Sequence, residues 1–222
     1  MKLLSIIIPA YNESATIGHL IEKILTVNTE KIGFKKEIIV VDDGSEDHTF
    51  QVASNFKGVK TYRKKNAGKG SAVRFGISKS FGDYVLIQDA DLEYNPSDYI
   101  QLLNPIFQNT KKNSKKIAIF GSRVMHKAKY TKQFKFLYRP KNQKLGPWLA
   151  NKILSITCFM LYRKWISDLL TGYKVYPGEF IRKIHIKTNG FETDHEITAK
   201  LINNKYSIIE VPIAYDPRGI DA

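Results

Sequence analysis

Two aspartates separated by one residue, Asp89 and Asp91, form the pattern with the clearest chemical meaning in this chain. They follow an apolar run that predicts a buried parallel strand at 83–88. Carboxylates at this spacing can hold a hard divalent cation together with the phosphates of a substrate. Asp-x-Asp alone is common on protein surfaces, so its meaning depends on what the fold brings beside it.

Two other predicted strands, at 3–9 and 37–41, also end in polar residues. In an open α/β sheet, ligands bind outside the carboxyl ends of the strands, so we expect the three ends to meet in one crevice. The simplest ligand for such a crevice is a metal-bound nucleotide diphosphate. At the first strand end, Tyr11 could stack on a base, while Glu13 could contact base or ribose or serve as a helix-start anion.

Asp42 and Asp43 end the second of these strands, where a carboxylate can accept the imide N–H of a pyrimidine or the N1/N2 hydrogens of guanine. A plain turn after the strand is the alternative, because Asp and Gly favour turns. Further on, Gly68-Lys69-Gly70 begins a predicted helix, and backbone N–H groups beside an ammonium group suit an anion. The spacing is not that of a Walker A loop.

A cluster of three carboxylates and a histidine, Glu192, Asp194, His195 and Glu196, starts another predicted helix. Acids enriched at a helix N-terminus explain the cluster without function. The functional alternative is a general base, with Asp194 preferred and Glu192 second, or contacts to an acceptor or metal. If the helix begins at Glu192, then 192 and 196 share a face and 194 points elsewhere, so the four cannot all serve one site.

Length and composition indicate one domain, because 222 residues with 43% apolar content can bury a substantial core. The one cysteine, Cys158, excludes an internal disulfide and is expected to be a buried structural thiol in a reducing compartment. No signal peptide is recognisable, and no uncharged run approaches the roughly 18 to 20 apolar residues of a membrane-spanning helix.

The net charge of +14 is concentrated in one segment. Residues 99–167 contain 15 Lys and Arg and not one Asp or Glu, whereas the rest of the chain has 20 basic and 21 acidic residues. A surface for phosphate groups or for an anionic membrane is the favoured interpretation. A solvated basic face and nucleic-acid binding are the alternatives.

Strands and helices alternate over the first 120 residues, which predicts a mostly parallel sheet with right-handed crossovers. Among the helices we expect one at 14–27 capped by Ser14, and a long one at 147–167. The long helix carries an apolar face of Leu149, Ile153, Ile156, Phe159 and Met160. In the second half, residues 125–145 are basic, aromatic and without periodicity, so a mobile loop is expected there.

An ordered set of motifs makes the chain resemble family 2 glycosyltransferases with the GT-A fold, above all the dolichyl-phosphate mannose synthase and polyprenyl-phosphate glycosyltransferase branch. The set comprises Ile8-Pro9-Ala10-Tyr11-Asn12-Glu13, Val41-Asp42-Asp43-Gly44-Ser45 with Asp47 and Thr49, Asn66-x-Gly68-Lys69-Gly70, Asp89-Ala90-Asp91-Leu92-Glu93, Gly121-Ser122-Arg123, Gly190-Phe191-Glu192 to Glu196-Ile197, and Glu210-Val211-Pro212-Ile213. The set covers nearly the whole chain and is specific as a whole.

The resemblance implies a single α/β GT-A domain over 1–222, with a nucleotide-sugar-binding half at 1–98 and an acceptor-binding half at 99–222 that holds the basic loop 125–145. It also implies a nucleotide diphospho-sugar donor. Donor contacts would come from Pro9, Tyr11, Glu13, Asp42, Asp43, Lys69, Asp89, Ala90, Asp91 and Arg123, with Arg218 a further candidate at the diphosphate. Asp91 and Asp89 would hold Mg²⁺ or Mn²⁺, and Asp194, Glu192 and Asp91 would be catalytic.

The expected reaction is inverting sugar transfer to a polyprenyl or dolichyl phosphate, by an enzyme held peripherally on the cytoplasmic face of an anionic membrane through 125–165. A glycan-modifying transferase with a hydroxyl acceptor is the alternative enzyme, and a basic lipid- or RNA-binding module is the non-enzymatic one. A nucleotidyltransferase is disfavoured, because 9–13 is not a Gly-rich basic loop, and no nucleic acid is expected as partner. Members of this branch often continue past the final strand into amphipathic or membrane helices. A second departure from their pattern is the segment Leu169-Leu170-Thr171-Gly172-Tyr173-Lys174, which is less polar than the corresponding segment expected in the branch. The nucleotide, the sugar, the acceptor and the oligomeric state stay open.

Overall fold

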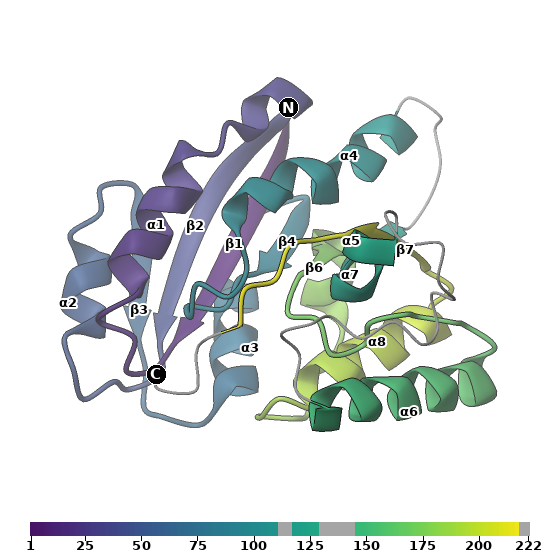
Figure 1. Ribbon diagram of the computed structural model, residues 1–222. Helices are drawn as coiled ribbons and strands as arrows, with labels where there is room; N and C mark the ends of the chain where they lie inside the picture. Colours follow the sequence, from purple (N-terminus) through teal and green to yellow (C-terminus); the bar gives the residue numbers. More distant parts are fainter. Residues whose placement is uncertain (111–116, 129–144, 218–222) are drawn as a thin grey trace.

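The computed structural model describes residues 1–110, 117–128 and 145–217. These residues form a seven-stranded sheet in the order β3-β2-β1-β4-β6-β5-β7, with helices on both faces (Figure 1). The strands are β1 (Lys2–Ala10), β2 (Phe34–Asp42), β3 (Val59–Arg63), β4 (Tyr84–Ile87), β5 (Ile117–Ser122), β6 (Lys174–Pro177) and β7 (Ser207–Pro212). Neighbouring strands are parallel except at β6, which is antiparallel to both β4 and β5. The expected single domain with a mostly parallel sheet is confirmed.

Helices cover both faces of the sheet and explain why its central strands are apolar throughout. One face packs against α1 (Ile17–Thr26), α2 (Thr49–Ser54) and α4 (Tyr99–Thr110), and the other against α3 (Lys69–Lys79), α7 (Gly178–Lys183) and α8 (Thr193–Asn203). In β1, Ile6 and Ile8 belong to the first core and Ile7 to the second, and all three are fully buried. A strand buried on both sides needs no alternation of apolar and polar residues.

The remaining elements lie in the second half or are single turns. They are α5 (Arg123–Ala128), α6 (Leu145–Tyr162) and two 3-10 turns, η1 (Thr29–Ile32) and η2 (Pro96–Asp98). The expected loop at 125–145 is wrong for 125–128, which belong to α5, and for 145, where α6 begins. Residues 129–144 of that expectation lie outside the described part of the chain.

Two helices have boundaries that differ from the sequence prediction. The first helix begins at Ile17 rather than at Ser14, because the Ser14 N–H donates to the Asp47 carboxylate and the chain makes a further turn, with Thr16 as the N-cap. The long helix ends at Tyr162 rather than at 167, because Arg163 adopts a left-handed backbone with φ 53°. A residue in this conformation commonly terminates a helix.

The long helix α6 turns its apolar face outwards. Figure 1 draws it as the green helix along the lower right of the molecule. Its exposed side chains include all five residues of the predicted apolar face, with exposures from 41% at Ile156 to 64% at Met160, whereas Asn151, Lys152, Ser155 and Cys158 are buried. Burial of Cys158 agrees with its expected structural role. Within the described residues, no helix has both the length and the apolar character needed to cross a membrane.

Candidate active site

A cavity of about 460 Å³ opens where the parallel strands β1, β2 and β4 end. Parallel pairing brings these ends to one edge: Ala10 pairs with Asp42, and Ile87 at the end of β4 pairs with Ile7, a few residues before β1 ends. The cavity, called the first cavity below, is lined by Pro9, Ala10, Tyr11, Glu13, Asp43, Asn66, Gly68, Lys69, Ala72, Asp89, Ala90, Asp91 and Phe191. The three polar strand ends therefore meet in one crevice, as predicted.

Asp43 fixes the loop that precedes α3. Its carboxylate accepts hydrogen bonds from the backbone N–H of Gly68 at 2.8 Å, from that of Ala67, and from the Lys64 ammonium at 2.5 Å. Gly68 has φ +94°, and an added Cβ would lie 2.8 Å from the Asn189 oxygen, so the loop needs glycine there. Asp43 lines the first cavity, and its carboxylate also fixes the backbone directly before Lys69.

Asp42 does not line the first cavity, which corrects its assignment to the donor site. Its side chain is fully buried, and one carboxylate oxygen accepts hydrogen bonds from the backbone N–H and the hydroxyl of Ser45. Ser45 in turn accepts from the Asn12 N–H at 3.0 Å. Successive residues of an extended strand point to opposite sides, so Asp42 and Asp43 cannot both face the same cavity. Asp42 instead ties the β1 and β2 ends together.

A second cavity of about 300 Å³ adjoins the first. Four residues line both, namely Lys69, Asp89, Asp91 and Phe191. The other residues that line the second cavity are Glu93, Tyr94, Arg123, Leu169, Leu170, Gly172, Glu192, Asp194, His195 and Tyr215. A ligand in the first cavity and a ligand in the second would thus meet at a lysine and two aspartates.

Lys69 and Asp89 form an ion pair at this junction. The ammonium Nζ lies 2.5 Å from Asp89 Oδ1 and 5.3 Å from the centre of the Phe191 ring. Burial opposes the charged form of Lys69, but the carboxylates of Asp89, Asp194 and Asp91 outweigh it and raise its pKa. Lys69 is therefore a permanent cation at the start of α3, aimed at the place where the two cavities meet.

Asp89 and Asp91 supply a donor set that suits a hard divalent cation shared with a substrate. Both carboxylates line the junction, and Asp91 Oδ1 also accepts the Glu93 N–H at 3.1 Å. In residues 1–110, 117–128 and 145–217, no group of three or more His, Cys, Asp or Glu side chains is placed to hold a metal by itself. Mg²⁺ typically binds through one or two carboxylates, substrate phosphates and water, which these two side chains fit.

The acidic start of α8 divides between the cavity and a structural role. Glu192, Asp194 and His195 line the second cavity. Glu196 points away, because its carboxylate accepts hydrogen bonds from Lys200, from Thr188 and from the backbone N–H of Lys187. Although burial opposes it, these bonds lower the pKa of Glu196 to about 2. Three of the four residues thus line one cavity and Glu196 does not. The expectation that Asp194 would point away from Glu192 assumed a helix beginning at Glu192, whereas α8 begins at Thr193 and Glu192 is its N-cap.

A buried lysine lies behind Asp194. Lys174 is 1% exposed, its Nζ is 4.0 Å from Asp194 Oδ1, and it donates to the Leu169 carbonyl at 3.1 Å. Burial lowers the pKa of Lys174, against the opposing effect of Asp194. Burial and the positive charge of Lys174 also lower the pKa of His195, so this imidazole is neutral at pH 7. Asp194 therefore lies between the buried Lys174 amine and the second cavity.

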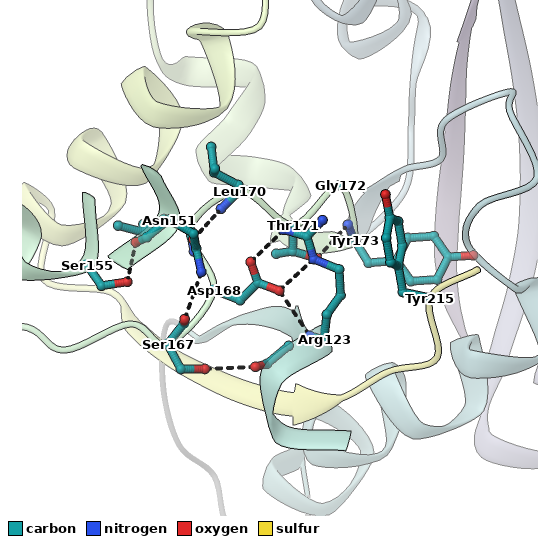
Figure 2. Close-up of polar contacts among 12 residues, drawn as sticks. Arg123, Asn151, Ser155, Ser167, Asp168, Leu170, Thr171, Gly172, Tyr173 and Tyr215 are labelled. Carbon is teal, nitrogen blue, oxygen red and sulfur yellow. Dashed lines mark hydrogen bonds and ion pairs between the residues drawn. The ribbon is translucent and has the colours of Figure 1, made fainter. Parts of the chain in front are cut away.

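Arg123 is held at the edge of the second cavity by a carboxylate that the sequence did not reveal. Its guanidinium donates twice to Asp168, at 2.8 Å each, and its backbone N–H donates to the same carboxylate at 3.0 Å. Figure 2 shows this clamp beside Tyr215, whose ring centre is 4.9 Å from the guanidinium carbon. Asp168 is fully buried, so Arg123 has one well-defined position.

Two tyrosines and a glycine at the second cavity were also missed. The Tyr215 hydroxyl donates to Glu93 at 2.8 Å, and burial and this carboxylate raise the pKa of Tyr215 to about 12. The Tyr94 hydroxyl accepts the Gly172 N–H at 2.9 Å. A Cβ at Gly172 would lie 2.6 Å from Asp89 Oδ2, so close approach explains glycine there. Arg218, the other expected diphosphate contact, lies outside the described residues.

Comparison with known proteins identifies the family of this chain. The model of glycosyl transferase family 2 matches residues 5–170. The dolichol-phosphate mannosyltransferase of Pyrococcus furiosus is 31% identical over 97% of this chain, which spans 57% of that protein. The UDP-N-acetylglucosamine–dolichyl-phosphate N-acetylglucosaminyltransferase of Methanococcus voltae is 27% identical over 96% of this chain and 85% of its own length.

Solved structures agree on the fold. Glucosyl-3-phosphoglycerate synthase from Mycobacterium tuberculosis, crystallised with Mn²⁺, UDP and phosphoglyceric acid, has a TM-score of 0.69 at 20% identity and covers 99% of this chain and 72% of its own. Mannosyl-3-phosphoglycerate synthase from Rubrobacter xylanophilus has a TM-score of 0.70 at 21% identity, and the match covers 98% of this chain and 67% of that one. At these identities the likeness establishes the shared fold, and the expected GT-A architecture is confirmed.

Proposed function

Because the chain belongs to glycosyl transferase family 2 and is a glycosyltransferase, we propose that it moves a sugar, with inversion, from a nucleotide diphospho-sugar to a polyprenyl or dolichyl phosphate. The observation that carries the proposal is the junction of two cavities at Lys69, Asp89 and Asp91. A donor in the first cavity would present its anomeric carbon to an acceptor in the second. Attack from the second cavity, opposite the leaving diphosphate, inverts that carbon.

The donor nucleotide would occupy the first cavity with its base at the outer end. Tyr11 is 45% exposed and could stack on the base, while Pro9, Glu13 and Asp43 line the same cavity. Ala90 lies between the two aspartates and leaves room for the ribose beside Asp89. The diphosphate would then reach Lys69, whose permanent charge stabilises the negative charge that develops as the sugar departs.

Mg²⁺ or Mn²⁺ held by Asp91 and Asp89 would act as a Lewis acid toward the leaving diphosphate, an effect worth several kcal/mol. Lys69 would act on the same oxygens from the α3 side, which its ion pair with Asp89 supports. Arg123, fixed by Asp168, offers a second cation from the opposite wall of the second cavity. It suits a phosphate on either the donor or the acceptor.

The acceptor class decides what Asp194 does. A polyprenyl phosphate is already anionic and has no proton to lose, so no base is needed, and Arg123 would bind its phosphate. A sugar hydroxyl must lose a proton, and Asp194 would then serve as general base, an effect of roughly 10²- to 10⁴-fold. Glu192 is the second choice, and its carboxylate accepts the Gly190 N–H at 3.0 Å. The names of the relatives favour the phosphate acceptor.

We expect donor binding to be measurable as thermal stabilisation. UDP- and GDP-sugars would be tested one at a time with Mn²⁺ and again with EDTA. A donor at 100 times its Kd contributes about 2.7 kcal/mol of stability. For a chain of this length that is a rise in Tm of roughly 5 to 10 °C. A metal-dependent shift with one donor, followed by transfer to a polyprenyl phosphate, supports the proposal, and no shift with any donor contradicts it.

A membrane surface is the proposed location of the acceptor, and α6 is the proposed contact. Its exposed face carries Leu149, Ile153, Phe159 and Met160, and Trp165 follows the helix with 43% exposure. The same helix lies in the segment 99–167, whose 15 Lys and Arg are accompanied by no acid. Apolar residues that enter the headgroup region, together with basic residues facing anionic lipid, are typical of interfacial helices. The exposed face of α6 is therefore proposed to bind an anionic bilayer.

Leu149→Glu should weaken binding to vesicles of phosphatidylcholine and phosphatidylglycerol by about tenfold or more, because one buried leucine is worth roughly 1.5 to 3 kcal/mol. Leu25→Glu is the matched control, since Leu25 on α1 is 47% exposed against 50% for Leu149 but lies outside the basic segment. Vesicle sedimentation at low and high salt measures both. Equal binding by the two variants, or no dependence on the anionic lipid, would rule out α6 as the contact.

A further inference from the structure

The backbone of residues 167–170 is held by two side chains from elements far apart in the sequence. Glu210 on β7 accepts the N–H groups of Ser167 and Asp168. Asn151 on α6 accepts the N–H groups of Leu169 and Leu170, at 2.9 and 3.2 Å. Four consecutive donors of a loop are thus satisfied by one carboxylate and one amide. Buried backbone donors require such partners, so the loop conformation depends on both.

Asn151 makes three hydrogen bonds to this loop. Besides accepting two N–H groups, its amide donates to the Ser167 carbonyl at 3.1 Å, as Figure 2 shows. The side chain is 1% exposed and lies on the buried polar strip of α6, opposite the exposed apolar face. A polar side chain in this position is unusual for packing, because the same helix has large apolar side chains that it leaves in solvent. The arrangement gives α6 a directed attachment to residues 167–170.

The loop that Asn151 holds carries much of the second cavity wall. Asp168 clamps the Arg123 guanidinium, and Leu169 and Leu170 line the cavity. Two residues further, Gly172 packs against Asp89. A shift of this backbone would therefore move the Arg123 cation and the apolar wall together. No residue of 167–172 lines the first cavity, so its shape should change less than that of the second.

We propose that Asn151 is a positioning residue that holds residues 167–170, and through Asp168 the Arg123 guanidinium, against the second cavity. The position of α6 then sets the geometry of the acceptor side, while the donor side depends on it less. The inference rests on the proposed function, in which the second cavity receives the acceptor. It predicts a selective effect on the acceptor, which general loss of packing would not produce.

Asn151→Ala should raise the acceptor KM by about 10- to 100-fold, because small misplacements of a binding group have effects of this order. The apparent Kd of the donor, measured by thermal stabilisation, should stay within about twofold of the wild-type value, because the donor binds in the first cavity. Amide hydrogen exchange of the peptide containing 167–172 should become faster, which reports the loop without any turnover. The chain would be assayed with its identified donor and a short-chain polyprenyl phosphate.

Ser155→Ala is the matched control. Ser155 is fully buried one turn further along α6, and its hydroxyl donates to the Asn151 carbonyl within the helix rather than to the loop. It should leave the acceptor KM and the exchange of 167–172 unchanged. If Asn151→Ala does not fold, Asn151→Ser, which keeps one hydroxyl able to accept an N–H, should give a smaller change of the same kind.

Two outcomes overturn the inference while leaving the proposed function intact. One is wild-type acceptor KM in a folded Asn151 variant, and the other is an equal loss of donor and acceptor binding. Failure of the proposed function looks different, because the wild-type chain itself would then show no donor-induced stabilisation and no transfer. The exchange measurement separates the two cases, since it does not require a reaction.

Discussion

Asp91→Asn should abolish sugar transfer while the protein stays folded. The amide keeps the size of the carboxylate and can still accept the Glu93 N–H, but it lacks the negative charge that a divalent cation requires. Loss of a Lewis-acid effect of several kcal/mol corresponds to a fall of at least about 10³-fold, at 1.36 kcal/mol for each factor of ten. Transfer of labelled sugar from the identified donor measures this.

A second readout separates loss of metal binding from loss of folding. The stabilisation by donor and Mn²⁺ should disappear in Asp91→Asn, while the Tm without ligand should stay close to that of wild type. Glu46→Gln is the control, because Glu46 is an exposed acid in the loop after β2 and its neutralisation changes the net charge equally. Metal-dependent transfer at wild-type rate in Asp91→Asn would show that Asp91 is not a ligand and would leave Asp89 as the candidate.

The sheet and the first cavity could be predicted because their signals are local. Each central strand is an apolar run that ends in polar residues, and parallel pairing brings such ends to one edge. The distinction between Asp42 and Asp43 was lost, since it depends on the residue at which β2 stops and on the side to which its last side chain points. The position of one strand end therefore decides which of two adjacent acids reaches a ligand.

The second cavity could be predicted only in part, because its contacts join residues that are distant in sequence. Asp168 meets Arg123 across 45 positions, and Tyr94 meets Gly172 across 78. Neither pair leaves a pattern that periodicity or spacing can reveal. Asp194 and Glu192 were found because the acidic cluster at the start of α8 is visible in the sequence.

The exposed face of α6 could not be predicted from the periodicity of the sequence, for a different reason. A helical stripe of apolar residues normally packs inwards, and the sequence gives its spacing but not its direction. Here Asn151, Ser155 and Cys158 face the protein, and the apolar stripe faces out. The cost of exposing that stripe is balanced if it enters a lipid surface, which is why the charge of residues 99–167 and the orientation of α6 support the same proposal.

Gly70→Ala should impair both stability and transfer, because the start of α3 touches the turn that carries the catalytic candidates of α8. A Cβ at Gly70 would lie 1.9 Å from Thr193 Oγ1 and 2.7 Å from the Asn189 carbonyl carbon. The turn is also tied to α3 by Ser71, whose N–H donates to the Asn189 carbonyl. The extra methyl group must push residues 189–193 away, and Phe191, Glu192 and Asp194 would move from Lys69.

Overpacking of this kind typically costs about 1 to 3 kcal/mol, and a displacement near 1 Å at a reacting centre can lower the rate by about 10²-fold. Gly146→Ala is the control, because Gly146 is also the second residue of its helix and nothing lies within 4 Å of an added Cβ. Thermal unfolding and single-turnover transfer measure the two effects. The double variant Gly70→Ala/Thr193→Ala should recover part of the stability, since the hydroxyl is removed but the Asn189 backbone still obstructs. Wild-type transfer in Gly70→Ala would mean that the spacing between Lys69 and Asp194 is unimportant, and the junction of the two cavities could not be the reacting centre.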